Sequence, residues 1–387
     1  MHNAIFAGKA AQGAKRVMRS AKHAARNAFR VARARAVWYH EHERMEGGVR
    51  VLKEYIEGYG SLSIIGMCKN AGKTTVLNRI IEELRESGRR LALTSIGRDG
   101  ESVDVVTRTA KPGIYVYEGT LIATAEDMFR LCDITKEILF ATGWPTPLGE
   151  VAVVRALSDG AVQLAGPSMT VQLSGLVKLF ASFGADITVI DGAISRKTLC
   201  APAVSEATVL CTGASYSRDI NEVVEDTAFA AALLTLPRQT LWSEEELLEE
   251  RAPKVRLMLE DGQKTPLPAG MTLGEALRSP AFARARGAFI SGAVTEAMLQ
   301  PVLQSSAALD GFELAALDGS KLLFPRHVLE KLRLRGVSLR VANPVHVAAV
   351  TINPVSAYGF DMDAGALLSR MRERVNVPVV NVMRAGE

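Results

Sequence analysis

The chain has 387 residues, of which 48% are hydrophobic and 23% are charged, and its formal net charge is +4. This composition is typical of a globular protein that is long enough to bury two hydrophobic cores. No apolar run approaches the roughly 20 residues that a membrane-spanning helix needs, and the four cysteines show neither CxxC pairing nor a metal-binding spacing, so we expect reduced thiols in a cytoplasmic protein.

Residues 1–44 form a basic segment that is rich in alanine and arginine. They carry a net charge of +8, so the remaining 343 residues carry −4. Such a segment is compatible with a basic helix that contacts nucleic acid or lipid, and also with an arginine-rich transit peptide. We favour a third interpretation, a solvated tail or upstream sequence that precedes a start at Met45. We therefore expect no nucleic-acid partner.

The first regular pattern after this segment is a strand, a helix and a second strand. The expected strands are Leu62–Ile65 and Leu91–Ile96, and the helix between them runs from about Thr74 to Ser87. Gly88 ends this helix in the manner of a left-handed cap. A βαβ unit of this length predicts a parallel sheet with helices on its faces, which is an α/β fold.

The alternation of strands and helices continues as far as Leu236-Pro237, where we place the end of a first domain that begins at residue 45. Its further expected elements are strands near Ile114, Val151 and Ala161, a helix over Met169–Phe183, strands over Ile187–Ile190 and Ala207–Cys211, and a helix over Asp219–Leu234.

A second, smaller α/β domain is predicted over residues 238–387. Ser243 and Glu246 have the spacing of a capping box, which marks the start of a helix between the two domains. The strands expected beyond it are Ala288–Ser291, Leu339–Ala342, Ala348–Ile352 and Val379–Val382.

The segment GMCKNAGKTT, residues 66–75, joins the first strand to the first helix. Gly72, Lys73 and Thr74 supply a small residue, a cation for the β- and γ-phosphates and a hydroxyl for Mg²⁺, and Thr75 follows them. The helix directs the positive end of its dipole at the same point. This pattern predicts a P-loop that binds a nucleoside triphosphate.

Five residues separate Gly66 from Gly72, where the usual P-loop has four between its glycines. The intervening Lys69, Asn70 and Ala71 are expected to line the nucleotide. Lys69 lies four residues before Lys73, and we expect it either to contact phosphate or to remain solvated. The long loop resembles that of dethiobiotin synthetase and its relatives.

Two carboxylates are expected beside this loop. Asp191 ends a predicted parallel strand at the sheet edge where ligands bind, so we interpret it as a Mg²⁺ ligand together with Thr74, the alternative being a cap on its own turn. Asp99, in the segment SIGRDGE after the second strand, is the candidate for positioning the attacking water or the metal, the alternative being a plain Asp-Gly turn.

The guanine-reading N-K-x-D motif is absent after the strand that ends at Cys211, which favours ATP over GTP. Near the C-terminus, the polar residues Asn353, Ser356, Tyr358 and Asp361 follow a buried-looking strand. They are interpreted either as a turn at the strand end or as a loop that contacts a ligand or partner.

Taken together, the strings GMCKNAGKTT, SIGRDGE, VIDGA and NPVSAYGFD resemble the KamB-type subunit of the lysine 5,6-aminomutase reactivase, from about Met45 to the C-terminus. The resemblance implies an ATPase that acts with a second, MutS-like subunit to release damaged cobalamin from an adenosylcobalamin-dependent aminomutase. Lys73 and Thr74 would correspond to the nucleotide loop of that family, and Asp191 to its strand-end acid.

Two other functions stay open. An ATP-dependent ligase of the dethiobiotin or cobyrinate type would need basic residues beside the γ-phosphate, and Arg98, Arg196 and Lys197 are available. A GTPase metallochaperone would need clusters of histidine and cysteine, which the sequence does not show.

We predict that deletion of residues 1–44 leaves both the melting temperature and ATP affinity unchanged, because a solvated tail buries no apolar surface. Thermal unfolding and calorimetric titration of the full and shortened chains measure this. A lower melting temperature of the shortened chain would show that the segment packs on the folded body.

Overall fold

The computed structural model describes residues 52–97, 113–192, 204–247, 254–282, 284–305 and 309–383. The chain divides into two compact units, 1–49 and 50–387, and the first lies outside the described residues. The interpretation of residues 1–44 therefore stays a prediction. Asp99, Arg98, Arg196 and Lys197 also lie outside the described residues.

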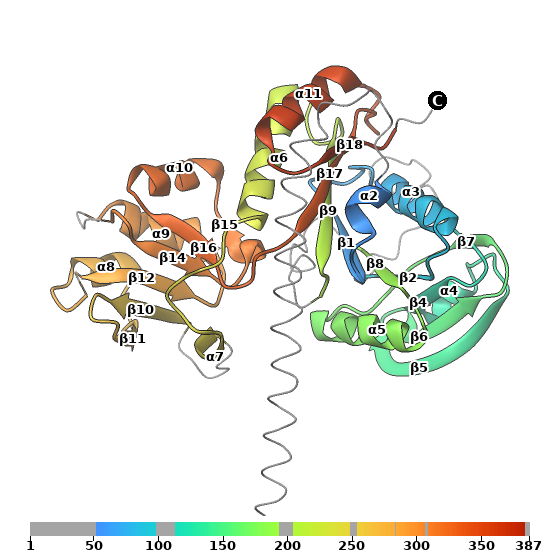
Figure 1. Cartoon of the computed structure of the whole chain (residues 1–387), viewed down its shortest axis with the longest axis horizontal. Coiled ribbons are helices and arrows are strands. Elements are labelled where there is room, and N and C mark those ends of the chain that lie inside the picture. Colours follow the sequence, from blue (N-terminus) through green and yellow to red (C-terminus); the bar gives the residue numbers. More distant parts are fainter. Residues whose placement is uncertain are drawn as a thin grey trace, which may run out of the picture. The chain divides into compact units, whose positions relative to one another are not determined.

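The described part of the chain is built around a nine-stranded sheet (Figure 1). Its first seven strands pair in parallel and only the last two, β6 and β5, pair antiparallel. The α/β fold with a mainly parallel sheet is thus confirmed. In order across the sheet, the strands are β18 (Val379–Asn381), β17 (Val347–Asn353), β9 (Ala207–Gly213), β1 (Ser61–Gly66), β8 (Ile187–Asp191), β2 (Leu91–Ser95), β4 (Leu121–Ala125), β6 (Gly149–Ala156) and β5 (Lys136–Thr146).

Helices cover both faces of this sheet, as right-handed crossovers between parallel strands require (Figure 1). The core on one face combines Ile65, Ile190 and Leu210 of the strands with residues of three helices. These helices are α5 (Thr170–Ser182), α6 (Ile220–Leu234) and α11 (Ala364–Arg374). On the other side, α2 (Lys53–Ile56) packs against α3 (Lys73–Glu86), which contacts β1 and β8.

The sequence of α3 explains why it forms and which side it buries. Its apolar residues recur at helical spacing and are at most 1% exposed, and burial of each is worth about 1.5–3 kcal/mol. Gly88, with φ of +69°, follows the end of α3 in the left-handed conformation. The buried apolar residues of α3 are Val76, Leu77, Ile80, Ile81 and Leu84.

Further short elements flank the antiparallel end of the sheet. The ribbon of β3 (Ile114–Val116) and β7 (Gly160–Val162) contacts α3 through β3, and α4 (Glu126–Phe129) follows β4 directly. No helix in the described residues is both long enough and apolar enough to cross a bilayer.

A second sheet of five strands lies between residues 255 and 341. β12, β14 and β16 are parallel, whereas β10 and β11 form a hairpin that joins β12 antiparallel. β13 and β15 pair with each other in a separate two-stranded sheet. The elements of this part of the chain are α7 (Glu244–Leu247), β10 (Val255–Leu259), β11 (Lys264–Pro266), α8 (Leu273–Arg278), β12 (Ala285–Ile290), β13 (Val294–Thr295), α9 (Glu296–Leu303), β14 (Glu313–Ala316), η2 (Gly319–Lys321), β15 (Leu322–Leu323), α10 (Arg326–Leu334) and β16 (Ser338–Val341).

The predicted extent of the second domain, residues 238–387, is wrong at its C-terminal end. β17 and β18 join the nine-stranded sheet, where β17 pairs with β9, so only residues up to about 342 belong to the second sheet. The second domain is therefore an insertion between α6 and β17. The apolar run of β17 predicts a buried parallel strand, but such a run does not say which of two sheets will bury it.

The two connections of the inserted domain are bonded to each other. The amide of Gln239 donates to the carbonyl of Val341 over 2.7 Å, and the amide of Val341 donates to the carbonyl of Pro237 over 3.0 Å. Nε of Arg238 donates to the carbonyl of Ala342 over 3.1 Å. The chain thus enters and leaves the second domain side by side.

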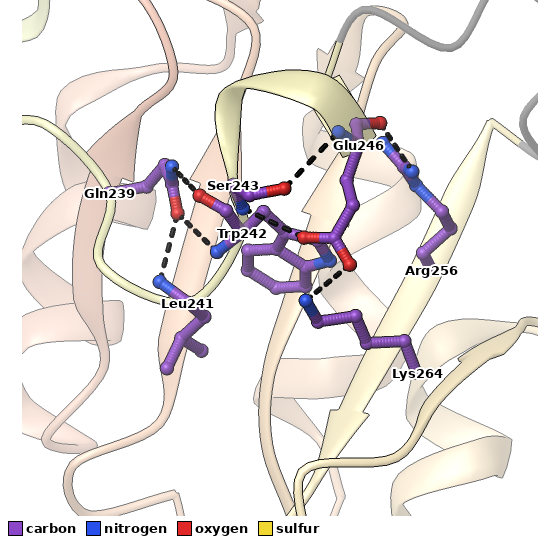
Figure 2. Close-up of polar contacts among 7 residues, drawn as sticks. All are labelled: Gln239, Leu241, Trp242, Ser243, Glu246, Arg256 and Lys264. Atoms are coloured by element: carbon purple, nitrogen blue, oxygen red, sulfur yellow. Dashed lines mark hydrogen bonds and ion pairs between the residues drawn. The ribbon is translucent and has the colours of Figure 1, made fainter.

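The predicted capping box at Ser243 is confirmed (Figure 2). The amide of Ser243 donates to the Glu246 carboxylate over 2.7 Å, and the amide of Glu246 donates to the Ser243 hydroxyl over 3.3 Å. Glu246 also pairs with Lys264 of β11, and its carbonyl accepts from Nη1 of Arg256 over 2.7 Å. α7 is therefore fixed to the β10–β11 hairpin.

We predict that Glu246→Gln lowers the free energy of unfolding at pH 7 by at most about 1 kcal/mol, because the pair with Lys264 is one-third exposed. The hydrogen bond from Lys264 holds the pKa of the Glu246 carboxyl below its usual value of 4.5. A carboxyl with a lowered pKa stabilises the fold above its unfolded-state pKa, and this contribution disappears as the pH falls through the folded-state value.

The measurement is urea unfolding of wild type and Glu246→Gln between pH 7 and pH 3. The difference between them should shrink below pH 4.5. Glu245→Gln, at the exposed neighbouring position, is the matched control and should follow wild type throughout. A difference that does not change with pH would contradict the role given to the Lys264 pair.

Candidate functional site

The loop between β1 and α3, residues 67–72, begins at the carboxyl edge of the parallel sheet. β1 lies between β8 and β9, with Ile64 opposite Asp191 and Gly66 opposite Cys211. The amide of Met67 donates to the carbonyl of Cys211 over 2.8 Å, which fastens the start of the loop to β9. In α/β sheets this carboxyl edge is where ligands bind.

Two residues of the loop adopt left-handed backbone conformations. Gly72 has φ of +89° and Asn70 has φ of +59°. Glycine takes such a conformation freely, and asparagine tolerates it better than most residues. The two turns bring the chain from the end of β1 into the first turn of α3, where the amide of Val76 donates to the carbonyl of Gly72 over 2.9 Å.

The side chain of Lys73 turns back over this loop. A Cβ atom placed on Gly66 would lie 3.2 Å from Nζ of Lys73, 3.3 Å from Cβ of Ala71 and 3.3 Å from the carbonyl oxygen of Cys68. The ammonium group therefore lies at the end of β1, inside the curve of the loop, and Gly66 leaves the space for it.

The start of α3 carries no negative charge of its own. Gly72 is its N-cap and gives no side-chain cap, and the first turn contains no acidic residue. The partial positive charge of the helix N-terminus is thus added to that of Lys73. Thr74 and Thr75 lie in the same turn, and both are half-buried.

The pKa values of two thiols indicate which charges lie near the loop. Burial raises the pKa of the Cys68 thiol to about 11, and the charge of Lys73 opposes that shift. Burial also raises the pKa of the Cys211 thiol to about 12, while Lys73 acts to lower it and Asp191 acts to raise it. Lys73 and Asp191 thus both lie within electrostatic reach of one buried thiol.

Asp191 is the last residue of β8 and is half-buried. It lies opposite Ile64 of β1 and opposite Ser95 of β2, so its strand is between the two strands that the sequence analysis connected by α3. Backbone hydrogen bonds hold the end of β8 in place. The amide of Gly192 donates to the carbonyl of Ile64 over 2.9 Å, and the amide of Ile96 donates to the carbonyl of Asp191 over 3.1 Å.

Asn353, the last residue of β17, is a contact of the loop that sequence reasoning did not assign. A Cβ atom on Gly72 would meet Cβ of Asn353 at 3.1 Å and Nδ2 at 3.3 Å. Oδ1 of Asn353 accepts from the amide of Val355 over 3.0 Å, so the amide group is oriented with Nδ2 toward Gly72. The signal in the sequence was the polar residue at the end of a buried strand.

The turn that follows Asn353 is bonded to the loop after β9. The amide of Ala214 donates to the carbonyl of Asn353 over 2.9 Å, and the amide of Ala357 donates to the hydroxyl of Ser215 over 3.1 Å. The guanidinium of Arg218 lies 4.6 Å from the ring centre of Phe360. The predicted polar cluster is therefore a turn whose first residue also contacts the β1–α3 loop.

The structure brings together most of the residues that the sequence pointed to. Gly66, Ala71, Gly72 and Lys73 meet within the loop, Thr74 and Thr75 follow in α3, and Asp191 ends the adjacent strand. Lys69 is exposed and interacts within the structure. Asn70 is half-buried, and its Nδ2 is a buried donor without a hydrogen-bond partner in the described residues.

Comparisons of the chain with protein-family models, with curated proteins and with solved structures found no match.

We predict that Gly72→Ala destabilises the fold by about 1–3 kcal/mol, because it adds a left-handed penalty and a close contact with Asn353. Gly88→Ala is the matched control, since Gly88 is also left-handed but has open space around its Cα. In the control, the free energy of unfolding should fall only by the left-handed backbone penalty, about 1–2 kcal/mol. Equal losses in chemical unfolding would show that Asn353 does not constrain Gly72.

Proposed function

We propose that the chain binds ATP with Mg²⁺ at the β1–α3 loop and hydrolyses it. The observation that carries the proposal is the position of the Lys73 ammonium, which turns back to the end of β1 and lies next to Gly66. A polyphosphate in this loop would meet Lys73, the helix N-terminus and the buried Nδ2 donor of Asn70, which are three sources of positive charge or hydrogen-bond donation.

The residues at the sheet edge suit a magnesium ion. Mg²⁺ prefers oxygen ligands and is usually held by one or two protein groups together with phosphate oxygens. Thr74 offers a hydroxyl in the first turn of α3, and Asp191 offers a carboxylate at the end of the neighbouring strand. When bound, the ion would neutralise charge on the phosphates.

The chain's own residues would perform the remaining work. Lys73 would hold the terminal phosphates and offset the negative charge that builds up on them in the transition state. Asn353, with Nδ2 directed toward Gly72, lies on the opposite side of β1 from Asp191 and would contact the rest of the nucleotide. Asp99 stays the candidate for positioning the attacking water.

The cellular role that we propose is the one that the resemblance implies, namely a reactivating factor for an adenosylcobalamin-dependent aminomutase, acting with a MutS-like second subunit. Release of a tightly bound corrinoid requires a protein with two conformations that differ in affinity for the enzyme. Nucleotide binding and hydrolysis provide such a switch. A separate domain inserted between α6 and β17 is a suitable carrier of the change, because β17 ends at Asn353, which contacts the β1–α3 loop.

We predict that Lys73→Ala weakens ATP binding at least about 100-fold, because a charge-assisted contact to phosphate is worth about 3 kcal/mol in this setting. Its melting temperature should stay within a few degrees of wild type, since Lys73 is only half-buried. Lys69→Ala is the matched control, an exposed lysine of the same loop, and it should bind ATP at least ten times more tightly than Lys73→Ala.

Calorimetric titration with Mg²⁺–ATP measures both variants. Unchanged affinity in Lys73→Ala would refute the nucleotide site. The requirements for nucleotide hydrolysis then distinguish the proposed roles. Slow ATP hydrolysis that a partner protein accelerates supports the role of reactivating factor. ATP turnover that requires a small organic acid would instead support the ligase. Preferential binding of GTP would support the metallochaperone.

A further inference from the structure

α6 begins beside the candidate nucleotide site. It follows the loop 214–219, which starts where β9 ends at Gly213. A Cβ atom on Gly213 would lie 2.0 Å from the carbonyl oxygen of Asn353, and the side chain of Asn353 rests against Gly72. The hydroxyl of Tyr216 in this loop donates to Asp226 of α6 over 2.7 Å. A shift of the β1–α3 loop would therefore reach the first turns of α6 through directly packed groups.

The end of α6 packs against the second domain. Leu233 and Leu236 belong to the hydrophobic core of that domain, together with Leu314 of β14 and Leu332 of α10. Gly319, at the start of η2, lies so close that a Cβ atom there would be 2.3 Å from the carbonyl oxygen of Leu233. The carboxyl end of β14, where α/β sheets often bind ligands, is thus used to hold the end of α6.

Ion pairs add a third contact along the middle of α6. Glu225 accepts from Nε and Nη2 of Arg374 in α11, both over 2.6 Å, and it lies 3.2 Å from Nη1 of Arg326 in α10. One carboxylate thus contacts the nine-stranded domain and the inserted domain. Exposed pairs of this kind contribute little stability, so the packing of Leu233 and Leu236 is the main contact between α6 and the inserted domain.

The helix itself is suited to transmit a displacement. Its sequence, INEVVEDTAFAAALL, contains neither glycine nor proline, so nothing in it favours a kink. The return connection leads through β17 to Asn353, which is at the same site. Both covalent links to the second domain therefore belong to elements that end against the nucleotide loop.

We propose that α6 and β17 couple the occupancy of the β1–α3 loop to the position of the inserted domain, residues 237–342. The proposal rests on the proposed nucleotide binding. Because such coupling is reciprocal, a partner that holds the inserted domain in one position changes the affinity for nucleotide by the same factor as nucleotide changes the affinity for the partner.

The test is hydrogen–deuterium exchange of the full chain with and without Mg²⁺ and a non-hydrolysable ATP analogue. In wild type, we expect the analogue to slow exchange in residues 66–76 and to change it by about threefold or more in residues 313–334, where the second domain meets α6. Protection of 66–76 with no response in 313–334 would overturn the coupling alone. No response in either segment would overturn the nucleotide site and the coupling with it.

A matched pair of glycine variants tests the route. Gly319→Ala places a methyl group against Leu233, whereas Gly292→Ala adds one where nothing lies within 4 Å, and both residues follow parallel strands of the second sheet. Gly319→Ala should keep the response of 66–76 and lose at least about half of the response of 313–334, and Gly292→Ala should behave as wild type. A full response in Gly319→Ala would overturn the proposal.

If Gly319→Ala does not fold, a second pair of variants tests the same route. Arg326→Gln removes the contact from α10 to Glu225 of α6, whereas Glu330→Gln removes only a pair within α10 with the same arginine. The response of 313–334 should be smaller in Arg326→Gln than in Glu330→Gln. Equal responses in the two variants would overturn the proposal.

Discussion

The left-handed turn at Gly72 is the constraint on which the site depends. It sets the direction in which α3 leaves the loop, and it places Lys73 so that its ammonium returns to the end of β1. A side chain at this position would carry a backbone penalty of about 1–2 kcal/mol and would also press on Asn353. The neighbouring strands fix the other parts of the site. β9 pairs with β1 at the start of the loop, and β8 holds Asp191 in register with β1.

Much of the first domain could be predicted from the sequence because local signals and burial agree there. Strands β1, β2, β8 and β9 are apolar runs bounded by glycine or polar residues, and α3, α5 and α6 have clear helical spacing. β5 was not predicted. It is an exposed edge strand that contains Gly143 and Pro145, its pairing with β6 is irregular, and such a strand has no buried face with a clean alternation.

The sequence was less informative about which segments meet. Ile352 and Asn353 are far from Gly72 along the chain, and local patterns carry no information on a pairing of that range. The same limit applied to the domain boundary, since the capping box at Ser243 was correctly placed but the return of the chain to β17 was not. Within the candidate site, the loop residues and Asp191 followed from residue type and spacing, whereas Asn353 required the sheet order.

The insertion of a whole domain between α6 and β17 also affects how the protein is made. Synthesis proceeds from the N-terminus, so the ribosome releases β1, α3, β8 and β9 well before β17. Until then β9 is left without its β17 neighbour, and Gly72 lacks its contact with Asn353. The unpaired N–H and C=O groups of an open strand edge can bond to a strand of another copy of the chain. A nascent chain would therefore depend on rapid folding of the inserted domain, or on a chaperone, to avoid such pairing. The β1–α3 loop is thus among the first parts of the chain to be translated, but it gains its contact with Asn353 only after β17 has been made.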